Sequence, residues 1–323
     1  MLNLTPLSPT PLVSVVTPSY NQADFLEQTI RSVLEQDYPR VEYLVVDGAS
    51  SDESVDIIKR YANKFSWWVS ERDSGQGEAI NKGLARTTGE IVAWLNSDDY
   101  YLPGAVSSAV KTFQQHPDAV LVYSDMLAVD GNGQTLNRLK YGQLSLEDLL
   151  CFQIIGQPSV FFRRDAYEQA GGLDISFHYM LDHHLWIRLA RQGRLVHVPL
   201  VWAAARFHPQ AKNRNLAVEF GREAFRILEW VKGQPDLAEI WARLKNRPLA
   251  AAHRVDARYL LDGRRPFASL RAWFTALFLH PPTALQRLNI LASALLQITG
   301  LSRVREAILR RRQQKYSEIG PNS

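Results

Sequence analysis

Two adjacent aspartates, Asp98 and Asp99, have the types and spacing in this 323-residue chain that most directly suggest chemistry. They follow the apolar run IVAWL (91–95) and two polar residues. Neighbouring carboxylates repel each other, and a divalent cation relieves that repulsion. Mg²⁺ and Mn²⁺ favour oxygen ligands, and Mg²⁺ is commonly held by one or two carboxylates together with substrate phosphates. The same pair is equally consistent with a cap on a helix near 102–110, and the dipeptide alone does not decide between the two.

Two further acids also follow or border apolar stretches. Asp47 ends VEYLVVD (41–47), where it could hydrogen-bond a base or a ribose, or simply form the following turn. Asp73 precedes Ser-Gly-Gln-Gly, which is either a loop whose glycines let a ligand approach the backbone or an ordinary flexible loop. The chain lacks the Gly-Lys-Ser/Thr ending of a Walker loop, and its first strand lacks GxGxxG. A standard dinucleotide-binding oxidoreductase is therefore disfavoured.

The elements that must position these acids alternate between strands and helices. Apolar and β-branched runs predict strands at 12–18, 41–47, 65–71 and 91–96, and helical spacing predicts helices at 21–36, around 55–58 and at 78–87. This alternation predicts an α/β fold with a mostly parallel central sheet flanked by helices. Ligands bind beyond the carboxyl ends of strands in such sheets, so we expect the polar residues that follow the four strands to share one rim.

The second half of the chain is less regular. Residues 119–130 and 134–141 flank Gly-Asn-Gly and predict a hairpin, and 158–164 predicts a further strand. Helices are expected at 166–174, where paired glycines end the helix, and at 180–193. Extended structure follows at 194–209, and the pattern is helical from about residue 215.

Composition limits the class of protein. With 46% hydrophobic and 22% charged residues the chain can build a sizeable core, so global disorder is excluded. The single cysteine, Cys151, rules out an internal disulfide framework and fits a reducing compartment. The N-terminal segment has no basic region before its apolar residues, and no run of about 18 apolar residues predicts a membrane span. We therefore expect a cytoplasmic protein, and its net charge of +4 suits an anionic substrate or a membrane surface.

Four sequence blocks together resemble the family 2 glycosyltransferases, which are inverting enzymes with a GT-A fold. The blocks are VSVVTPSYNQADFLEQTIRSVLEQDYP (13–39), EYLVVDGASSDESVDIIKRY (42–61), WVSERDSGQGEAINKGLARTTGEIVAWLNSDD (68–99) and GQPSVFFRRDAYEQAGGLD (156–174). The resemblance covers roughly residues 12–210. It implies a GT-A catalytic domain at 12–212, preceded by a lead-in at 1–11 and followed by a C-terminal helical region at 213–323.

The resemblance also assigns the donor site. It implies that the nucleotide sugar is bound by the first loop, by the acids after the second and third strands, by a lysine of AINKG and by the segment around the paired aspartates: Thr17, Pro18, Tyr20, Asn21, Asp47, Asp73, Lys82, Asn96 and Asp98. The family's metal motif falls on Ser97-Asp98-Asp99, with Asp99 as the direct ligand of Mn²⁺ or Mg²⁺ and Asp98 facing the ribose or the sugar. The family commonly has two acids where this chain has Val46 and Asp47, so one of them is missing here.

The remaining assignments concern the second half of the chain. Asp182 matches the family's catalytic base at the start of a late helix; the alternative is a helix N-cap, and His184 stands where the family often has an acid. We expect Trp186 to be a core residue. His208 resembles a late histidine that ligates the metal or contacts the diphosphate, although a lone histidine is more often structural. Arg206 and Lys212 could neutralise phosphate or be solvated surface residues, while His183, His184 and His197 are expected to be solvent-facing, acceptor-side or packing residues.

The C-terminal region contains apolar helical faces and many arginines, with a basic run at 301–316. A basic amphipathic helix can lie in a membrane interface and contact anionic lipid, whereas the alternative is packing on the catalytic domain or on another subunit. We expect peripheral contact with the inner face of the cell membrane.

These observations together predict a metal-dependent inverting glycosyltransferase that moves a sugar from a UDP-sugar to a hydroxyl of a glycan or lipid-linked saccharide in cell-surface polysaccharide synthesis. A non-catalytic nucleotide-sugar-binding protein and a sugar nucleotidyltransferase are the alternatives. The chain has no evident glycine- and arginine-rich triphosphate loop, which disfavours the nucleotidyltransferase. No nucleic-acid partner is expected.

Overall fold

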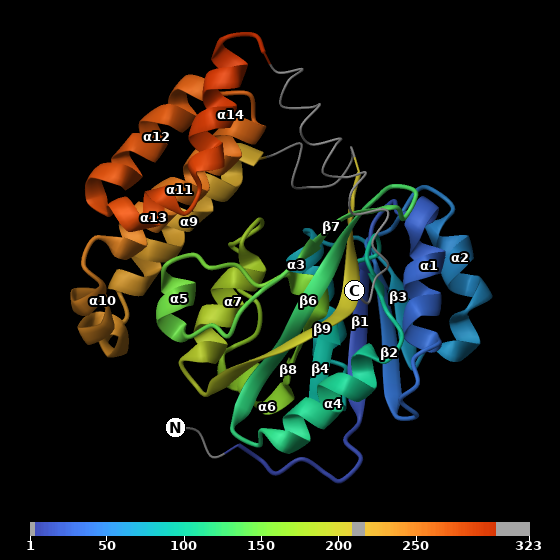
Figure 1. Ribbon diagram of the computed structural model, residues 1–323. Coiled ribbons are helices and arrows are strands. Elements are labelled where there is room, and N and C mark those ends of the chain that lie inside the picture. The colour runs from blue at the N-terminus through green and yellow to red at the C-terminus, as the bar shows by residue number, and fades with distance from the viewer. Residues whose placement is uncertain (1–3, 209–216, 302–323) are drawn as a thin grey trace. The chain divides into compact units, whose positions relative to one another are not determined.

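The computed structural model of the protein describes residues 4–208 and 217–301 (Figure 1). Lys212, the expected domain boundary at 212/213 and the basic run beyond residue 301 lie outside the described residues. The chain divides into two compact units. The first comprises Met1–Ser145 with Ile155–Phe207, and the second comprises Leu146–Ile154 with His208–Ser323.

A single mixed sheet forms the centre of the first unit. Its strand order is β3-β2-β1-β4-β8-β6-β9-β5, with β7 paired to β6 at the side of this path. The strands are β1 (Val13–Ser19), β2 (Val41–Asp47), β3 (Trp67–Ser70), β4 (Ile91–Trp94), β5 (Tyr100–Tyr101), β6 (Ala119–Asp130), β7 (Thr135–Leu139), β8 (Val160–Arg163) and β9 (Arg194–Phe207). Pairs β1–β2, β1–β4, β2–β3 and β6–β9 are parallel, so the expected mostly parallel arrangement is confirmed for the first four strands, while β4–β8, β6–β8, β6–β7 and β5–β9 are antiparallel.

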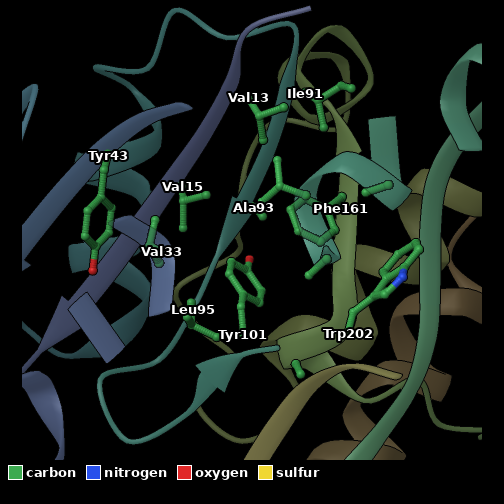
Figure 2. Close-up of a cluster of buried hydrophobic side chains, with 14 of the residues drawn as sticks. Val13, Val15, Val33, Tyr43, Ile91, Ala93, Leu95, Tyr101, Phe161 and Trp202 are labelled. Atoms are coloured by element: carbon green, nitrogen blue, oxygen red, sulfur yellow. The ribbon is translucent and has the colours of Figure 1, made fainter. Parts of the chain in front are cut away.

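Helices cover both faces of this sheet because its central strands are apolar on both sides. The helices of the first unit are α1 (Ala23–Leu34), α2 (Ser54–Arg60), α3 (Gln76–Leu84), α4 (Ala105–Gln115), α6 (Arg164–Gln169) and α7 (Leu181–Ala190). On one face, Val13 and Val15 of β1 belong to a cluster with buried residues of α1, α2 and α4, together with Tyr101, Phe161 and Trp202 (Figure 2).

The other face of β1 and β2 receives α3. Gly83 makes this approach possible, because a Cβ at this position would clash with the side chains of Val16 and Val46. The AINKG segment therefore brings α3, and with it the loop that carries Asp73, close to the carboxyl ends of the central strands. A larger residue at position 83 would push this loop away from the sheet.

The predicted elements match the structure closely where their apolar pattern is long. The hairpin of β6 and β7 is confirmed. The helix expected at 166–174 is α6, which spans only Arg164–Gln169; Gly171 and Gly172, with φ angles of +79° and +75°, follow its end. The two-residue strand β5 and the short helix α5 (Leu146–Leu150) were not predicted.

The second unit is helical. It contains α5 and, after residue 216, α9 (Ala217–Lys232), α10 (Ala238–Leu244), α11 (Arg247–Asp262), α12 (Pro266–Leu279), α13 (Pro281–Leu285) and α14 (Leu288–Ile298). Arg254 of α11 is buried and donates hydrogen bonds to the backbone carbonyls of Cys151 and Phe152, which follow α5. Within the described residues no helix has the length and apolar content that a membrane crossing requires.

Candidate functional site

Asp47 ends β2 beside the ends of two neighbouring strands. In the parallel registers it lies next to Ser19 of β1 and Ser70 of β3. Its carboxylate is fully buried and accepts hydrogen bonds from the backbone N–H of Ser50 (2.9 Å) and from the hydroxyls of Ser50 (2.5 Å) and Ser70 (2.7 Å). Asp47 therefore builds the turn after β2. Its contact with a nucleoside stays a prediction.

The loops after β1 and β2 are fastened to each other. Asn21 has a left-handed φ of 51°; its backbone N–H donates to the Ser50 hydroxyl (2.8 Å) and its side-chain oxygen accepts the Ser51 N–H (2.8 Å). Asp52 accepts the backbone N–H of Ala23 at the start of α1 (3.0 Å). Asn21 thus links the loop after β1 to the loop after β2, whether or not it also contacts a nucleotide.

The other residues predicted for the first loop differ in exposure. Thr17 and Pro18 are buried in β1, and the Thr17 hydroxyl shares a 2.9 Å hydrogen bond with the Tyr43 hydroxyl inside the core. Tyr20 is 62% exposed. Of these three residues, Tyr20 is the one that offers its side chain to a ligand, and the predictions for Thr17 and Pro18 stay untested.

Asp73 lies against the turn that Asp47 builds. A Cβ on Gly48 would lie 2.9 Å from Asp73 Oδ2, so glycine at position 48 leaves room for this carboxylate. Burial raises the pKa of Asp73, although the Gly75 N–H, which donates to Oδ1 at 2.8 Å, acts in the opposite direction. The acids predicted to hold the nucleoside are therefore neighbours in space.

Lys82 of α3 lies among acids beside this loop. Its ammonium is 2.9 Å from a Glu71 carboxylate oxygen and 3.8 Å from a Glu78 oxygen. The hydrogen bond to Glu71 raises the pKa of Lys82, and the charges of Glu71, Glu78 and Asp73 add to this effect. The predicted position near the diphosphate stays a prediction.

Asn96 connects the Asp73 loop with the paired aspartates. Its side-chain oxygen accepts a 2.7 Å hydrogen bond from the side chain of Gln76, the first residue of α3. Its amide nitrogen donates to Gln157 (3.1 Å) and makes a long contact with Asp99 Oδ2 (3.4 Å). Gln157 in turn donates to the backbone carbonyl of Trp94 (2.7 Å). One chain of amides therefore joins three segments around Asp99.

Gln76 and Gln157 were not predicted as site residues. Gln76 lies in the SGQG loop and Gln157 in the GQPS segment, so both stretches were noticed in the sequence without a role for the glutamine. Their partners are 20 and 61 residues away in the chain. Only the fold shows that these side chains meet.

Asp99 is a buried carboxylate with fewer hydrogen bonds than Asp47. It is 6% exposed, and Oδ1 accepts the backbone N–H of Arg206 (2.9 Å) while Oδ2 has the long contact with Asn96. Burial and then the neighbouring charge of Asp98 raise the pKa of Asp99 well above its ordinary value, and these two hydrogen bonds do not compensate. The alternative that either aspartate caps the next helix is wrong: α4 begins at Ala105, its N-cap residue is Gly104, and no side chain caps it.

Arg206, near the end of β9, holds the same segment from the other side. Its guanidinium donates to the backbone carbonyl of Asp98 (2.7 Å) and to the Gln28 side chain (2.5 Å), and it lies 4.5 Å from the ring centroid of Phe25. Arg206 is buried rather than solvated at the surface. It fixes the aspartate pair through the backbone carbonyl of Asp98 and places a positive charge beside the two carboxylates.

Asp182 occupies the first turn of α7. The N-cap residue of α7 is Met180, so Asp182 is not the cap, and its Oδ1 accepts the backbone N–H of His183 (2.7 Å). Residues four apart share one face of a helix, so Asp182 lies one turn from Trp186 on the same face. Trp186 is fully buried and stacks on Trp94 (ring centroids 5.3 Å apart), which confirms it as a core residue. This stacking brings the face that carries Asp182 against β4, the strand that leads to the paired aspartates.

The neighbouring histidines serve packing. His183 and His184 are both buried, and the His184 ring lies 4.3 Å from that of Phe177. His197 of β9 is 2.9 Å from Asp125, a buried acid at a bulge of β6. His208 follows β9, is buried and falls in the second unit, so its contact with metal or diphosphate stays a prediction.

A second acid, Asp125, and the predicted base, Asp182, both lie near Tyr141. Asp125 accepts hydrogen bonds from His197 and from the backbone N–H of Tyr141 (2.9 Å), and Arg138 is 3.2 Å from its other oxygen. Burial raises the pKa of Tyr141 above its ordinary range, and the charges of Asp125 and Asp182 add to the rise. Sequence reasoning missed this group because its members are local only in the fold.

The mixed sheet and its covering helices form a GT-A type fold, shared with solved glycosyltransferase structures. The family model of Glycosyl transferase family 2 matches residues 14–177, just over half of the chain, and the protein belongs to this family. Among curated relatives, TuaG of Bacillus subtilis, named as a teichuronic acid biosynthesis glycosyltransferase, is 32% identical over 189 residues, which are 57% of this chain and 73% of TuaG. An uncharacterized glycosyltransferase of Rickettsia typhi is 29% identical over 221 residues, covering 64% of this chain and 67% of that protein.

Solved structures resemble the fold over most of the chain. TarS 1-349 of S. aureus in complex with UDP-GlcNAc has a TM-score of 0.60 at 16% identity and covers 92% of each chain. The mannosyltransferase PcManGT of Pyrobaculum calidifontis, in complex with GDP-Man and Mn²⁺, has a TM-score of 0.57 at 20% identity and covers 95% of this chain and 90% of that one. The predicted GT-A fold with a C-terminal helical region is confirmed.

Proposed function

We propose that this protein is a metal-dependent, inverting glycosyltransferase that transfers a sugar from a UDP-sugar to a hydroxyl of a glycan or a lipid-linked saccharide. The observation that carries the proposal is the buried carboxylate of Asp99, which lies beside a second acid, Asp98, at the end of the amide chain from the Asp73 loop. Such a carboxylate fits a site that a cation-bound diphosphate completes.

The donor set fits a divalent cation of this kind. Within the described residues no group of three or more His, Cys, Asp or Glu side chains is arranged to hold a metal ion by itself. Mn²⁺ or Mg²⁺ bound to Asp99 would therefore take its other ligands from the donor diphosphate, from water and, in our prediction, from His208. When bound, the cation would stabilise the negative charge that develops on the departing nucleoside diphosphate. The structure of PcManGT contains Mn²⁺ and a nucleoside-diphosphate sugar, which supports this choice by analogy.

The nucleoside is proposed to lie along the rim between Tyr20 and Asp73. Tyr20 offers an exposed ring, Asp73 lies over Gly48, and Asp98 is next to the metal ligand, where a ribose or sugar hydroxyl would approach. UDP is the nucleoside diphosphate that we propose, in line with the UDP-GlcNAc complex of TarS; GDP, as in the GDP-Man complex of PcManGT, is the competing choice. The fastened loops after β1 and β2 would hold this rim in place without reorganisation on binding.

Asp182 is the proposed catalytic base. In a single displacement the acceptor oxygen attacks the anomeric carbon opposite the diphosphate; the new C–O bond forms as the bond to the phosphate oxygen breaks, and the acceptor proton passes to the carboxylate. Asp182 is partly exposed at the start of α7, on the helix face that packs against β4, and is thus available to an acceptor hydroxyl. The name of TuaG, a teichuronic acid biosynthesis glycosyltransferase, supports cell-surface polysaccharide synthesis as the setting.

Two measurements test the proposal. A thermal-shift panel of nucleoside diphosphates and their sugars, with and without Mn²⁺, identifies the donor, because a ligand that binds the native state raises the melting temperature with its concentration. Asp182→Asn is then expected to lower the transfer rate by roughly 10²–10⁴-fold while the donor still stabilises the protein. Glu168→Gln, at an exposed acid of α6, is the matched control and should transfer at the wild-type rate.

Three outcomes would contradict the proposal. A wild-type rate in Asp182→Asn removes the base assignment. Donor binding without any transfer or hydrolysis in the wild type indicates the non-catalytic binding protein. Consumption of a nucleoside triphosphate with release of pyrophosphate indicates the nucleotidyltransferase.

A further inference from the structure

The outer face of α12 carries large apolar side chains in contact with solvent. Phe267, Phe274 and Phe278 are 72%, 53% and 90% exposed. Their spacing of seven and then four residues places them on one stripe of the helix. Single exposed apolar residues are common on proteins, but an aligned aromatic stripe of this kind marks an interaction surface.

The opposite face of α12 is already used for packing. Ala272, Trp273 and Ala276 are buried in a cluster with residues of α11 and α14. The helix is therefore apolar on both sides, a pattern that is typical of helices enclosed by protein or lipid rather than by water. Its inner side is enclosed by the second unit, and its outer side is open in the described structure.

The helix α14 repeats this arrangement. None of its 11 residues is charged; Ile290 and Ala294 are buried, whereas Leu288 and Leu295 are 52% and 49% exposed. Leu288 and Leu295 are seven residues apart, so they also lie on one stripe. The helices α12 and α14 pack against each other in the second unit (Figure 1).

The segment that contains α12 and α14, residues 263–301, has basic side chains but no acidic ones. Residues 263–301 contain four arginines and no acid, whereas residues 1–262 contain 27 basic and 31 acidic side chains, a formal net charge of −4. Arg264 and Arg265 precede α12 and are exposed, and Arg271 lies on the aromatic stripe itself, between Phe267 and Phe274. A face of aromatic side chains interspersed with arginine complements a surface that is apolar below and anionic above.

We propose that the outer face of α12 and α14 docks on an anionic lipid bilayer. The three phenylalanines would enter the boundary between headgroups and acyl chains, and the arginines would meet the lipid phosphates. At 14 residues α12 is about 21 Å long, so it lies in the interface and does not span the bilayer. A symmetric contact between two copies of this face would set arginine against arginine, which favours the lipid as the occupant.

Co-sedimentation with vesicles tests this proposal on the full chain without donor or acceptor, so the result does not depend on the proposed transfer reaction. Wild-type protein is expected to bind vesicles of equal parts phosphatidylcholine and phosphatidylglycerol, and to bind pure phosphatidylcholine at least roughly tenfold more weakly. Replacing all three phenylalanines by serine (Phe267→Ser, Phe274→Ser, Phe278→Ser) should lower binding to the mixed vesicles by at least roughly tenfold. Leu200→Ser is the control, because Leu200 is 53% exposed but lies on β9. This variant should bind the vesicles as the wild type does.

Two further measurements test the role of the arginines and distinguish a lipid surface from a second copy of the protein. Arg264→Gln, Arg265→Gln and Arg271→Gln together should remove the preference for phosphatidylglycerol and leave the circular dichroism spectrum unchanged. Light scattering measures the oligomeric state of the wild type and of the serine variant. Absence of vesicle binding in the wild type, or equal binding by wild type and serine variant, overturns the proposal. A wild-type dimer that dissociates in the serine variant and does not bind vesicles assigns the face to a second copy.

Discussion

Asp47 and Asp99 are both buried aspartates at the ends of the central sheet, and their surroundings differ. Asp47 accepts three hydrogen bonds of 2.5–2.9 Å from the Ser50 backbone, the Ser50 hydroxyl and the Ser70 hydroxyl. Asp99 accepts one backbone N–H and a long amide contact, and the next residue is another acid. The protein thus supplies the donors that one carboxylate needs and withholds them from the other.

This difference separates structure from function at one rim. A buried carboxylate that is fully hydrogen-bonded stabilises the fold, whereas one held beside a like charge with a raised pKa costs stability until a ligand compensates it. We therefore infer that Asp47 maintains the turn beside Asp73, and that Asp99 is the carboxylate whose charge a bound cation would compensate. The predictions below test this division.

The largest expected effect is on transfer activity. Asp99→Asn removes the negative charge that would hold the cation, and we expect the transfer rate to fall by roughly 10²–10³-fold. Activity with the donor found in the thermal-shift panel, at saturating Mn²⁺, measures this. Asp47→Asn keeps one acceptor oxygen and the shape of the side chain, so this variant should lose much less activity. Equal losses of activity in the two variants would contradict the proposed difference between Asp47 and Asp99.

The second effect is on stability. Asp47→Ala leaves the Ser50 N–H and two hydroxyls without their partner, so the free energy of unfolding should fall by about 2–4 kcal/mol, as measured by urea denaturation. Asp130→Ala is the matched control, because Asp130 also accepts backbone N–H groups in a turn, those of Asn132 and Gln134, but at an exposed site. Its loss should stay near or below about 1 kcal/mol. A wild-type stability for Asp47→Ala would mean that the turn does not need its carboxylate.

The third effect concerns the amide chain. Asn96→Ala disconnects Gln76 and Gln157 from Asp99 without touching a charge, so we expect roughly tenfold lower kcat/KM with little change in melting temperature. Asn137→Ala on β7 is the control and should behave as the wild type. An unchanged kcat/KM for Asn96→Ala would show that the three segments are positioned independently.

The smallest effect is a pH dependence of stability without ligand. Because burial raises the folded pKa of Asp99, the folded state binds more protons than the unfolded state above about pH 3.9. The free energy of unfolding therefore falls as the pH rises from the unfolded pKa through the folded one. Asp99→Asn should remove this slope and be more stable than the wild type near pH 7. A wild type that gains stability relative to Asp99→Asn over this interval would contradict the sign.

Sequence patterns predicted the part of the site that local chemistry determines. Long apolar runs identified the four strands, and the rule that parallel strands end at one edge brought Asp47, Asp73 and Asp99 to one rim. The structure confirms this convergence for Asp47 and its neighbours through the strand registers. The resemblance to a family added the roles of these residues and of Asp182, and all of these roles remain predictions.

What the sequence could not provide depends on contacts between distant residues. Gln157 reaches Asn96 across 61 residues, and Arg206 reaches Asp99 across 107, so no local pattern predicts either contact. The helix-cap alternative for Asp98 and Asp99 was open for a related reason, because only the fold shows that α4 begins at Ala105 with Gly104 as its N-cap. The strand β5 has only two residues, too few for a periodic signal.

Proton release on ligand binding tests the role of Asp99 most directly. Calorimetric titration with Mn²⁺ and the nucleoside diphosphate, in two buffers of different ionisation enthalpy, counts the protons that binding displaces. We expect the wild type to release a proton in mildly acidic buffer, where the raised pKa keeps Asp99 protonated, and Asp99→Asn to release none and to bind Mn²⁺ with the nucleotide far more weakly. Equal affinity and equal proton release in the two proteins would show that Asp99 does not hold the cation.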